Sequence, residues 1–209
     1  MTGQFLTPSA WRGYRRADFP DPDWVVEDDA LHARTCAEPV SLISRERYGD
    51  FDLTLEWRLP VGGNSGILFR VTEEADQPWQ SGPEMQLLHD AGHPDGRVPE
   101  TSCGALYGLK APQNVPLCPP GLYNVGRISV RGDHVEHWLN GVRVLDCDLA
   151  SEDFRARVAR SKFRDCPRFA RVPEGHIVLQ HHGTDAWFAD IRIDIPGRKE
   201  ADVRRRASE

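Results

Sequence analysis

The sequence predicts an all-β protein, a two-sheet antiparallel β-sandwich with one short helical or irregular insertion. Runs in which apolar and polar residues alternate recur along the chain. In residues 50–59, Phe51, Leu53, Leu55 and Trp57 would share one face of a strand. Turn-forming residues separate these runs, and the 18 glycines and 16 prolines supply many of them. Short strands linked by such turns are typical of sandwiches.

The remaining elements follow from the same alternation. Asp133 after Gly132, and Gly141 after Asn140, predict tight turns between neighbouring strands. Strands are expected at 50–59, 65–71, 84–89, 127–131, 134–139, 142–146, 176–181 and 188–193. We expect one domain over residues 1–196 and a polar tail over 197–209.

The Arg-rich segment from residue 150 to 169 lacks alternation. Its first part, 151–160, is expected to form a helical turn or two. Ser151 is a suitable N-cap, and Glu152 and Asp153 would lie near the positive end of that helix.

Composition excludes several classes of protein. The formal net charge of −6 disfavours nucleic acid as a partner, because phosphate binding requires a basic surface. No apolar stretch approaches the length of a membrane span. The five cysteines form no C-x-x-C pair and are read as free thiols. The first residues resemble no secretory signal, so a cytoplasmic protein is expected.

Seven stretches, in order, resemble the 3-keto-disaccharide hydrolase family. They lie at 48–58, 63–70, 84–88, 104–107, 136–141, 161–163 and 175–180. The resemblance implies a concanavalin A-like or laminin-G-like jelly roll. It also implies an enzyme, a glycoside hydrolase or lyase that cleaves sugars already oxidised to a ketone at C3. Two motifs depart from the family pattern: His181 stands where the family has Asp, and Ala189-Asp190 replaces Arg-Asn.

The implied chemistry differs from ordinary glycoside hydrolysis. A C3 ketone acidifies the proton on C2, so a base can form an enolate that expels the C1 substituent, after which water adds. This route needs a base, a stabiliser of the enolate oxygen and an acid for the leaving group. It does not need the flanking pair of carboxylates that ordinary glycosidases use.

Strand parity identifies candidate residues for this chemistry. Polar members of three predicted strands fall on one face of each strand, and we expect these faces to adjoin in one concave sheet that binds sugar. The candidate catalytic residues are Glu84, His182, Arg70 and His137. The candidate substrate-binding residues are Asn64, Gln86, Tyr107, Trp138 and Gln180, with Trp79 as a further aromatic surface for the carbohydrate substrate.

Alternatives remain open at this point. His137 shares its face with Val135 and Leu139, so a core histidine is an equal reading. His89 and Asp90 are weak candidates for a divalent cation, a possible cofactor. The fold class also hosts non-catalytic carbohydrate-binding modules. A ligand-sensing or scaffolding role is a third possibility, based on the basic residues at 155–171. If that segment packed over the concave face, it would instead favour an active-site lid.

Overall fold

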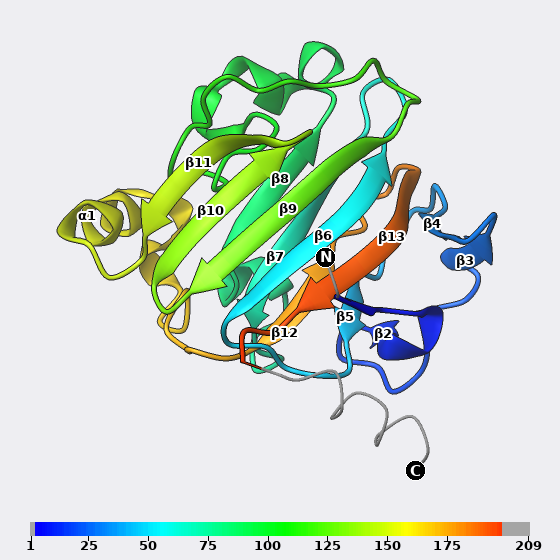
Figure 1. The fold of residues 1–209 in the computed structure, drawn as a ribbon, viewed down its shortest axis with the longest axis horizontal. Coiled ribbons are helices and arrows are strands. Elements are labelled where there is room, and N and C mark those ends of the chain that lie inside the picture. Colours follow the sequence, from blue (N-terminus) through cyan, green and yellow to red (C-terminus); the bar gives the residue numbers. More distant parts are fainter. Residues whose placement is uncertain (1–2, 198–209) are drawn as a thin grey trace.

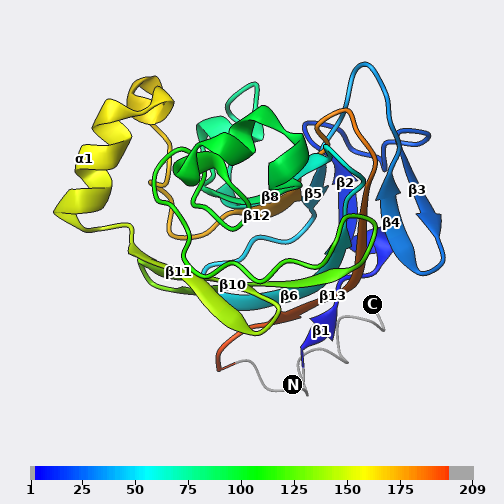
Figure 2. The same ribbon diagram turned by 90° about the horizontal axis from the view of Figure 1, so that it is seen from above.

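The computed structural model describes residues 3–197, and two antiparallel sheets face each other across one core, as predicted (Figures 1 and 2). The larger sheet has the order β11 (Val142–Asp148), β10 (His134–Leu139), β9 (Asn124–Arg131), β6 (Phe51–Arg58), β13 (Ala186–Asp194), β4 (Ala30–Ala33) and β3 (Trp24–Glu27), with β1 (Gln4–Phe5) paired to β13. The smaller sheet has the order β2 (Trp11–Gly13), β5 (Leu42–Ser44), β12 (His176–Leu179), β7 (Asn64–Val71) and β8 (Glu84–Leu88).

Helical structure is short in the described chain. The α-helix α1 spans Glu152–Arg160 and lies at one edge of the molecule beside β11 (Figure 2). The 3₁₀ turns are η1 (Pro8–Ala10), η2 (Pro78–Gln80), η3 (Asp90–Gly92), η4 (Pro94–Arg97), η5 (Pro99–Thr101) and η6 (Lys162–Asp165). No helix within residues 3–197 has the length and apolar composition needed to cross a membrane. Most of the predicted tail, from residue 198 onward, lies outside the described residues.

The core forms where the inner faces of the two sheets meet. Strand β6 follows the predicted alternation, with every second residue from Phe51 to Trp57 buried. Ile67 and Phe69 of β7 meet this face from the other sheet. Fully burying a side chain of this size stabilises the fold by about 1.5–3 kcal/mol. Alternation in the sequence of β6 therefore indicates which side of this strand faces the other sheet.

Strand β7 departs from simple alternation at Arg70. This residue has a φ of 55°, and the register with β12 shifts between His176 and Val178. Such a bulge reverses which side the following residue faces, so Leu68 and Val71, three positions apart, lie on the same outer face. There they pack with Tyr14, Ile43, Val178 and Trp79.

The Arg-rich segment adopts the predicted helix. The Ser151 hydroxyl accepts a hydrogen bond from the Phe154 amide at 3.1 Å, which confirms the N-cap. Beyond the helix, the rings of Phe163 and Phe169 stack with centroids 4.1 Å apart, and Phe163 also contacts Trp79. These contacts fix η6 beside the outer face of the smaller sheet.

Candidate active site

A cavity of about 530 Å³ opens on the outer face of the smaller sheet. Its base comes from β7, β8 and the residues that follow β12. Its walls come from the η2 turn, the start of η6 and the loops before β5. The lining residues used below are Asn64, Trp79, Glu84, Gln86, Tyr107, Lys162, Gln180 and His182. The volume is in the range of small-molecule sites.

The predicted adjacency of three polar strand faces is confirmed. Strands β8, β7 and β12 are neighbours in the smaller sheet. Gly66 lies opposite Gln86 in the register of β7 and β8, and the Gln180 amide donates to the Gly66 carbonyl oxygen at 2.8 Å. The sheet therefore places Glu84, Gln86 and Gln180 around Gly66.

Glu84 is a buried carboxyl group with only 6% of its surface exposed. Its side chain lies directly over Gly66, because a Cβ atom at that position would stand 2.0 Å from Glu84 Oε1. Burial raises the pKa of Glu84 to about 8, and the nearby Asp95 adds to the rise. The positive charge of Lys162 and a hydrogen bond with Gln180 act in the opposite direction. Glu84 therefore carries a proton at neutral pH.

Three carboxamide groups present unpartnered atoms beside this carboxyl. Asn64 Oδ1, Gln180 Oε1 and both polar atoms of Gln86 are buried without a hydrogen-bond partner. Leaving a buried polar atom unpaired costs about 1–3 kcal/mol. All three residues line the cavity, so a ligand rich in hydroxyl groups could satisfy them.

Aromatic rings form one wall around a lysine that the sequence reasoning did not single out. The Lys162 Nζ atom lies 4.7 Å from the ring centroid of Trp79, 4.5 Å from that of Tyr107 and 5.2 Å from that of Phe163. The Tyr107 hydroxyl donates to Asp95 Oδ2 at 3.1 Å. The sequence signal that could have identified Lys162 was the stretch 161–163, which resembles the family but was assigned no functional role.

His182 lines the cavity and is exposed to solvent. Partial burial and the neighbouring His93 lower its pKa, so the imidazole is neutral at neutral pH. The preceding His181 has a different position. Its Nε2 donates to the Arg34 carbonyl oxygen at 3.0 Å, and its Nδ1 accepts from the Gly183 amide at 3.1 Å. Where the family has Asp, this histidine thus fixes the loop that carries His182.

Two predicted catalytic residues lie outside the cavity, as does one predicted binding residue. Arg70 is turned away by the bulge and pairs with Asp133 at 3.1 Å, in the turn between β9 and β10. His137 is fully buried in the core, with Nδ1 3.0 Å from the Gly104 carbonyl oxygen; burial lowers its pKa to about 4. The Trp138 indole donates to Glu136 on the solvent face of β10. Because β10 belongs to the larger sheet, neither of its faces reaches the cavity.

The weak metal candidates have structural partners instead. His89 Nδ1 accepts from the Gly62 amide at 3.0 Å, and Asp90 Oδ1 accepts from the Cys103 amide at 2.9 Å. Neither residue lines the large cavity.

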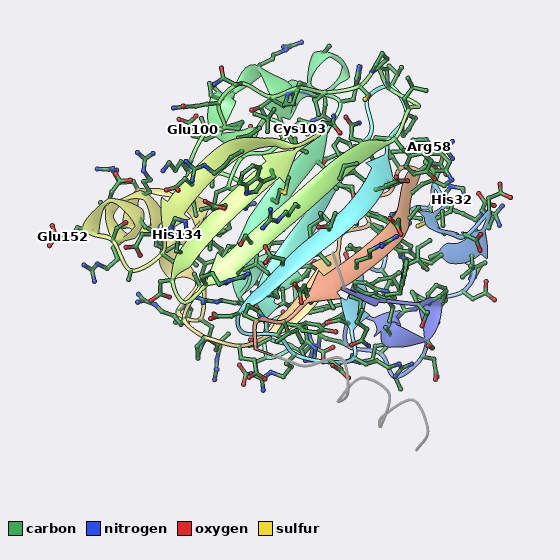
Figure 3. All side chains as sticks on the ribbon, viewed as in Figure 1. His32, Arg58, Glu100, Cys103, His134 and Glu152 are labelled. Atoms are coloured by element: carbon green, nitrogen blue, oxygen red, sulfur yellow. The ribbon has the colours of Figure 1, made fainter. Side chains whose placement is uncertain are left out.

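Over residues 3–197, one group of three metal-ligand side chains comes within mutual reach, namely His134, Glu136 and Asp146. It lies on the solvent face of β10 and β11, where Figure 3 labels His134. Arg143 bridges its two carboxylates at 2.7 and 3.2 Å, so this group is an ion-pair network. A divalent cation as a possible cofactor stays a prediction.

Comparison with known proteins places the chain in a family. The profile of the 3-keto-alpha-glucoside-1,2-lyase-like domain matches residues 3–194. The chain belongs to this family. A 3-keto-disaccharide hydrolase from Bacteroides thetaiotaomicron is 27% identical over 223 residues, covering 90% of this chain and 75% of the relative. The recognition made from the seven sequence stretches is therefore confirmed.

Solved structures support the same fold. A candidate glycosyl hydrolase from Parabacteroides distasonis superimposes with a TM-score of 0.83 at 25% identity, covering 90% of this chain and 89% of that one. A carbohydrate-binding module from Bacillus subtilis superimposes with a TM-score of 0.57 at 11% identity, covering 91% and 99% of the two chains. The second likeness shows a shared sandwich fold alone.

Proposed function

We propose that this member of the 3-keto-alpha-glucoside-1,2-lyase-like family cleaves the glycosidic bond of 3-keto-glycosides or 3-keto-disaccharides. The observation that carries the proposal is that Glu84 and His182 line the same cavity, where burial raises the pKa of Glu84 and lowers that of His182. Two groups whose environments move their pKa values in opposite directions fit an acid and a base. The name of the Bacteroides relative supports the choice of a 3-keto sugar.

The resting protonation states assign the roles. Neutral His182 takes the proton from C2, and the electron pair of that C–H bond forms a C2–C3 double bond while the carbonyl pair moves to the C3 oxygen. The enolate then re-forms the ketone, a C1–C2 double bond forms, and the C1–O bond breaks. Its electron pair leaves on the aglycone oxygen, which takes the proton of Glu84.

Hydration would restore the starting protonation states of Glu84 and His182. The Glu84 carboxylate takes a proton from water, the resulting hydroxide adds to C1, and His182 returns its proton to C2. The net reaction then consumes one water, as in a hydrolase. If the unsaturated keto sugar leaves before hydration, the protein is a lyase. The names of the family and of the Bacteroides relative differ on this point, and product analysis decides it.

The remaining lining groups suit a sugar. The carboxamides of Asn64, Gln86 and Gln180 offer both donors and acceptors to hydroxyl groups. Trp79 and Tyr107 offer apolar ring surface to the C–H face of a pyranose.

The second candidate is a non-catalytic carbohydrate-binding module, which the shared sandwich fold favours. A binding module gains nothing from a carboxyl group that is buried and protonated, because burial costs free energy without contributing proton transfer. Catalysis is therefore the better account of Glu84.

The test is product formation from a panel of 3-keto-glucosides and their unoxidised parents, with and without EDTA. We expect cleavage of the keto forms alone, and a loss of about 10²-fold or more in the Glu84→Gln and His182→Asn variants. Glu136→Gln, a carboxylate on the opposite sheet, is the matched control and should keep full activity. Saturable sugar binding without any turnover would replace the enzyme with the binding module. Sensitivity to EDTA would establish the predicted cation.

A further inference from the structure

The elimination route requires a group that stabilises negative charge on the C3 oxygen, and Arg70 lies outside the cavity. The cation whose charge acts on Glu84 is Lys162 instead. It lies at the start of η6, in the Arg-rich segment rather than on a strand of either sheet. Stacking of Phe163 on Phe169 and the contact of Phe163 with Trp79 fix this turn beside the cavity.

Two opposing effects act on the charge of the Lys162 ammonium group. Three aromatic rings approach Nζ, with centroids at 4.5–5.2 Å, and each ring face attracts a cation. Partial burial lowers the pKa of Lys162 below its usual value, although the negative charge of the nearby Asp95 acts in the opposite direction.

The donors of this ammonium group are available to a ligand. Within residues 3–197, the Lys162 ammonium group makes no hydrogen bond or ion pair, although Lys162 lines the same cavity as Glu84. An ammonium group has three donors and no acceptor, so its natural partner is an oxygen that carries or gains negative charge. The aromatic rings do not accept hydrogen bonds from these N–H groups as an oxygen would.

We propose that Lys162 is the enolate-stabilising residue, whose ammonium donates to the C3 oxygen of a bound 3-keto-glycoside. This inference rests on the proposed elimination route. Negative charge grows on that oxygen as the C2 proton leaves, so the interaction strengthens toward the transition state and accelerates enolate formation. Glu84 acts in the later step, when the aglycone oxygen departs.

Because Lys162 and Glu84 act in different steps, one experiment can distinguish their roles. Three variants are compared with wild type: Lys162→Met, Lys162→Arg, and the control Lys110→Met, whose ammonium contacts the Asp146 carbonyl oxygen away from the cavity. Exchange of the C2 hydrogen is measured in D₂O by NMR, alongside cleavage of an alkyl and a 4-nitrophenyl 3-keto-glucoside. Exchange reports enolate formation, and 4-nitrophenolate leaves without protonation.

We expect Lys162→Met to lower both exchange and kcat by about 10²–10³-fold, with KM changed by less than about fivefold. Lys162→Arg should recover part of the rate, and Lys110→Met should match wild type. The 4-nitrophenyl substrate should rescue Glu84→Gln but not Lys162→Met, because only the former lacks the leaving-group acid.

Three results would overturn the assignment. Exchange in Lys162→Met within threefold of an active wild type would show that the ammonium is dispensable. Rescue of that variant by the 4-nitrophenyl substrate would assign Lys162 to the leaving group. Borohydride trapping of substrate on Lys162 would show that Lys162 acts through a covalent imine and not as an ammonium donor. If wild type neither exchanges nor cleaves any 3-keto-glycoside, the proposed function itself fails, and the role of Lys162 fails with it.

Discussion

Replacing Gly66 by alanine should displace the Glu84 carboxyl group and leave the rest of the fold in place. Gly66 lies in β7 with an ordinary extended backbone, so alanine fits its conformation. The added Cβ would stand 2.0 Å from Glu84 Oε1 and 2.8 Å from its Cδ. These atoms form the flexible end of one side chain, so the glutamate can yield without a shift of the backbone.

The size of the effect follows from this geometry. An ordinary contact with a Cβ atom begins near 3.4 Å, so Oε1 must retreat by about 1.4 Å from its present separation of 2.0 Å. Misplacing a catalytic group by about 1 Å can cost about 10²-fold in rate. We therefore expect kcat for an alkyl 3-keto-glucoside to fall by about 10²-fold in Gly66→Ala, with a smaller loss for the 4-nitrophenyl substrate.

The assay needs a glycine control and a stability measurement. At Gly49, an added Cβ would meet the Pro173 carbonyl oxygen at 3.6 Å, an ordinary contact, so Gly49→Ala should keep wild-type kcat. Thermal unfolding of both variants checks that the fold persists. A folded Gly66→Ala enzyme within threefold of wild-type kcat would refute the reasoning, because the position of Glu84 would then not matter.

Three further predictions concern pH and the residues outside the cavity. The kcat/KM profile should be bell-shaped: it should rise below pH 6.5 as His182 loses its proton, and fall near pH 8 as Glu84 loses its own. A profile that rises through pH 8 would instead identify Glu84 as the base. His137 should make folding pH-dependent: its pKa falls from 6.5 in the unfolded chain to about 4 in the fold, so stability is full above pH 6.5 and declines by about 3 kcal/mol as the pH falls to 4. Denaturant titrations should show a weaker decline in His137→Gln, and equal slopes would contradict this account. Arg70→Met should lower Tm, because the ion pair with Asp133 is lost, and should leave kcat unchanged. A fall in kcat without a fall in Tm would show that Arg70 acts in catalysis.

The alternation of Glu84 and Gln86 with Met85 and Leu87 was enough to place the polar pair on one face of a strand. It reflects a local rule, since successive side chains of a strand point to opposite sides. The Ser151 cap was predictable for the same reason, because the capping oxygen and its partner amide are three residues apart. Family membership likewise came from short stretches in a fixed order.

Other features depended on distant parts of the chain. The side reached by Arg70 is set by a bulge against β12, and the sequence of β7 alone carries no sign of that register shift. His137 and Trp138 follow strand parity correctly, yet they belong to the larger sheet, and parity cannot tell which sheet a strand joins.

The sequence by itself thus determined the sandwich class, the faces of its regular strands, the helix cap and the family. Tertiary structure alone decided which faces line one cavity, and it brought Lys162 from an irregular segment into the same cavity as Glu84. The physical reason is that backbone periodicity acts over a few residues, whereas the cavity is assembled by pairing and packing between segments about a hundred residues apart along the chain.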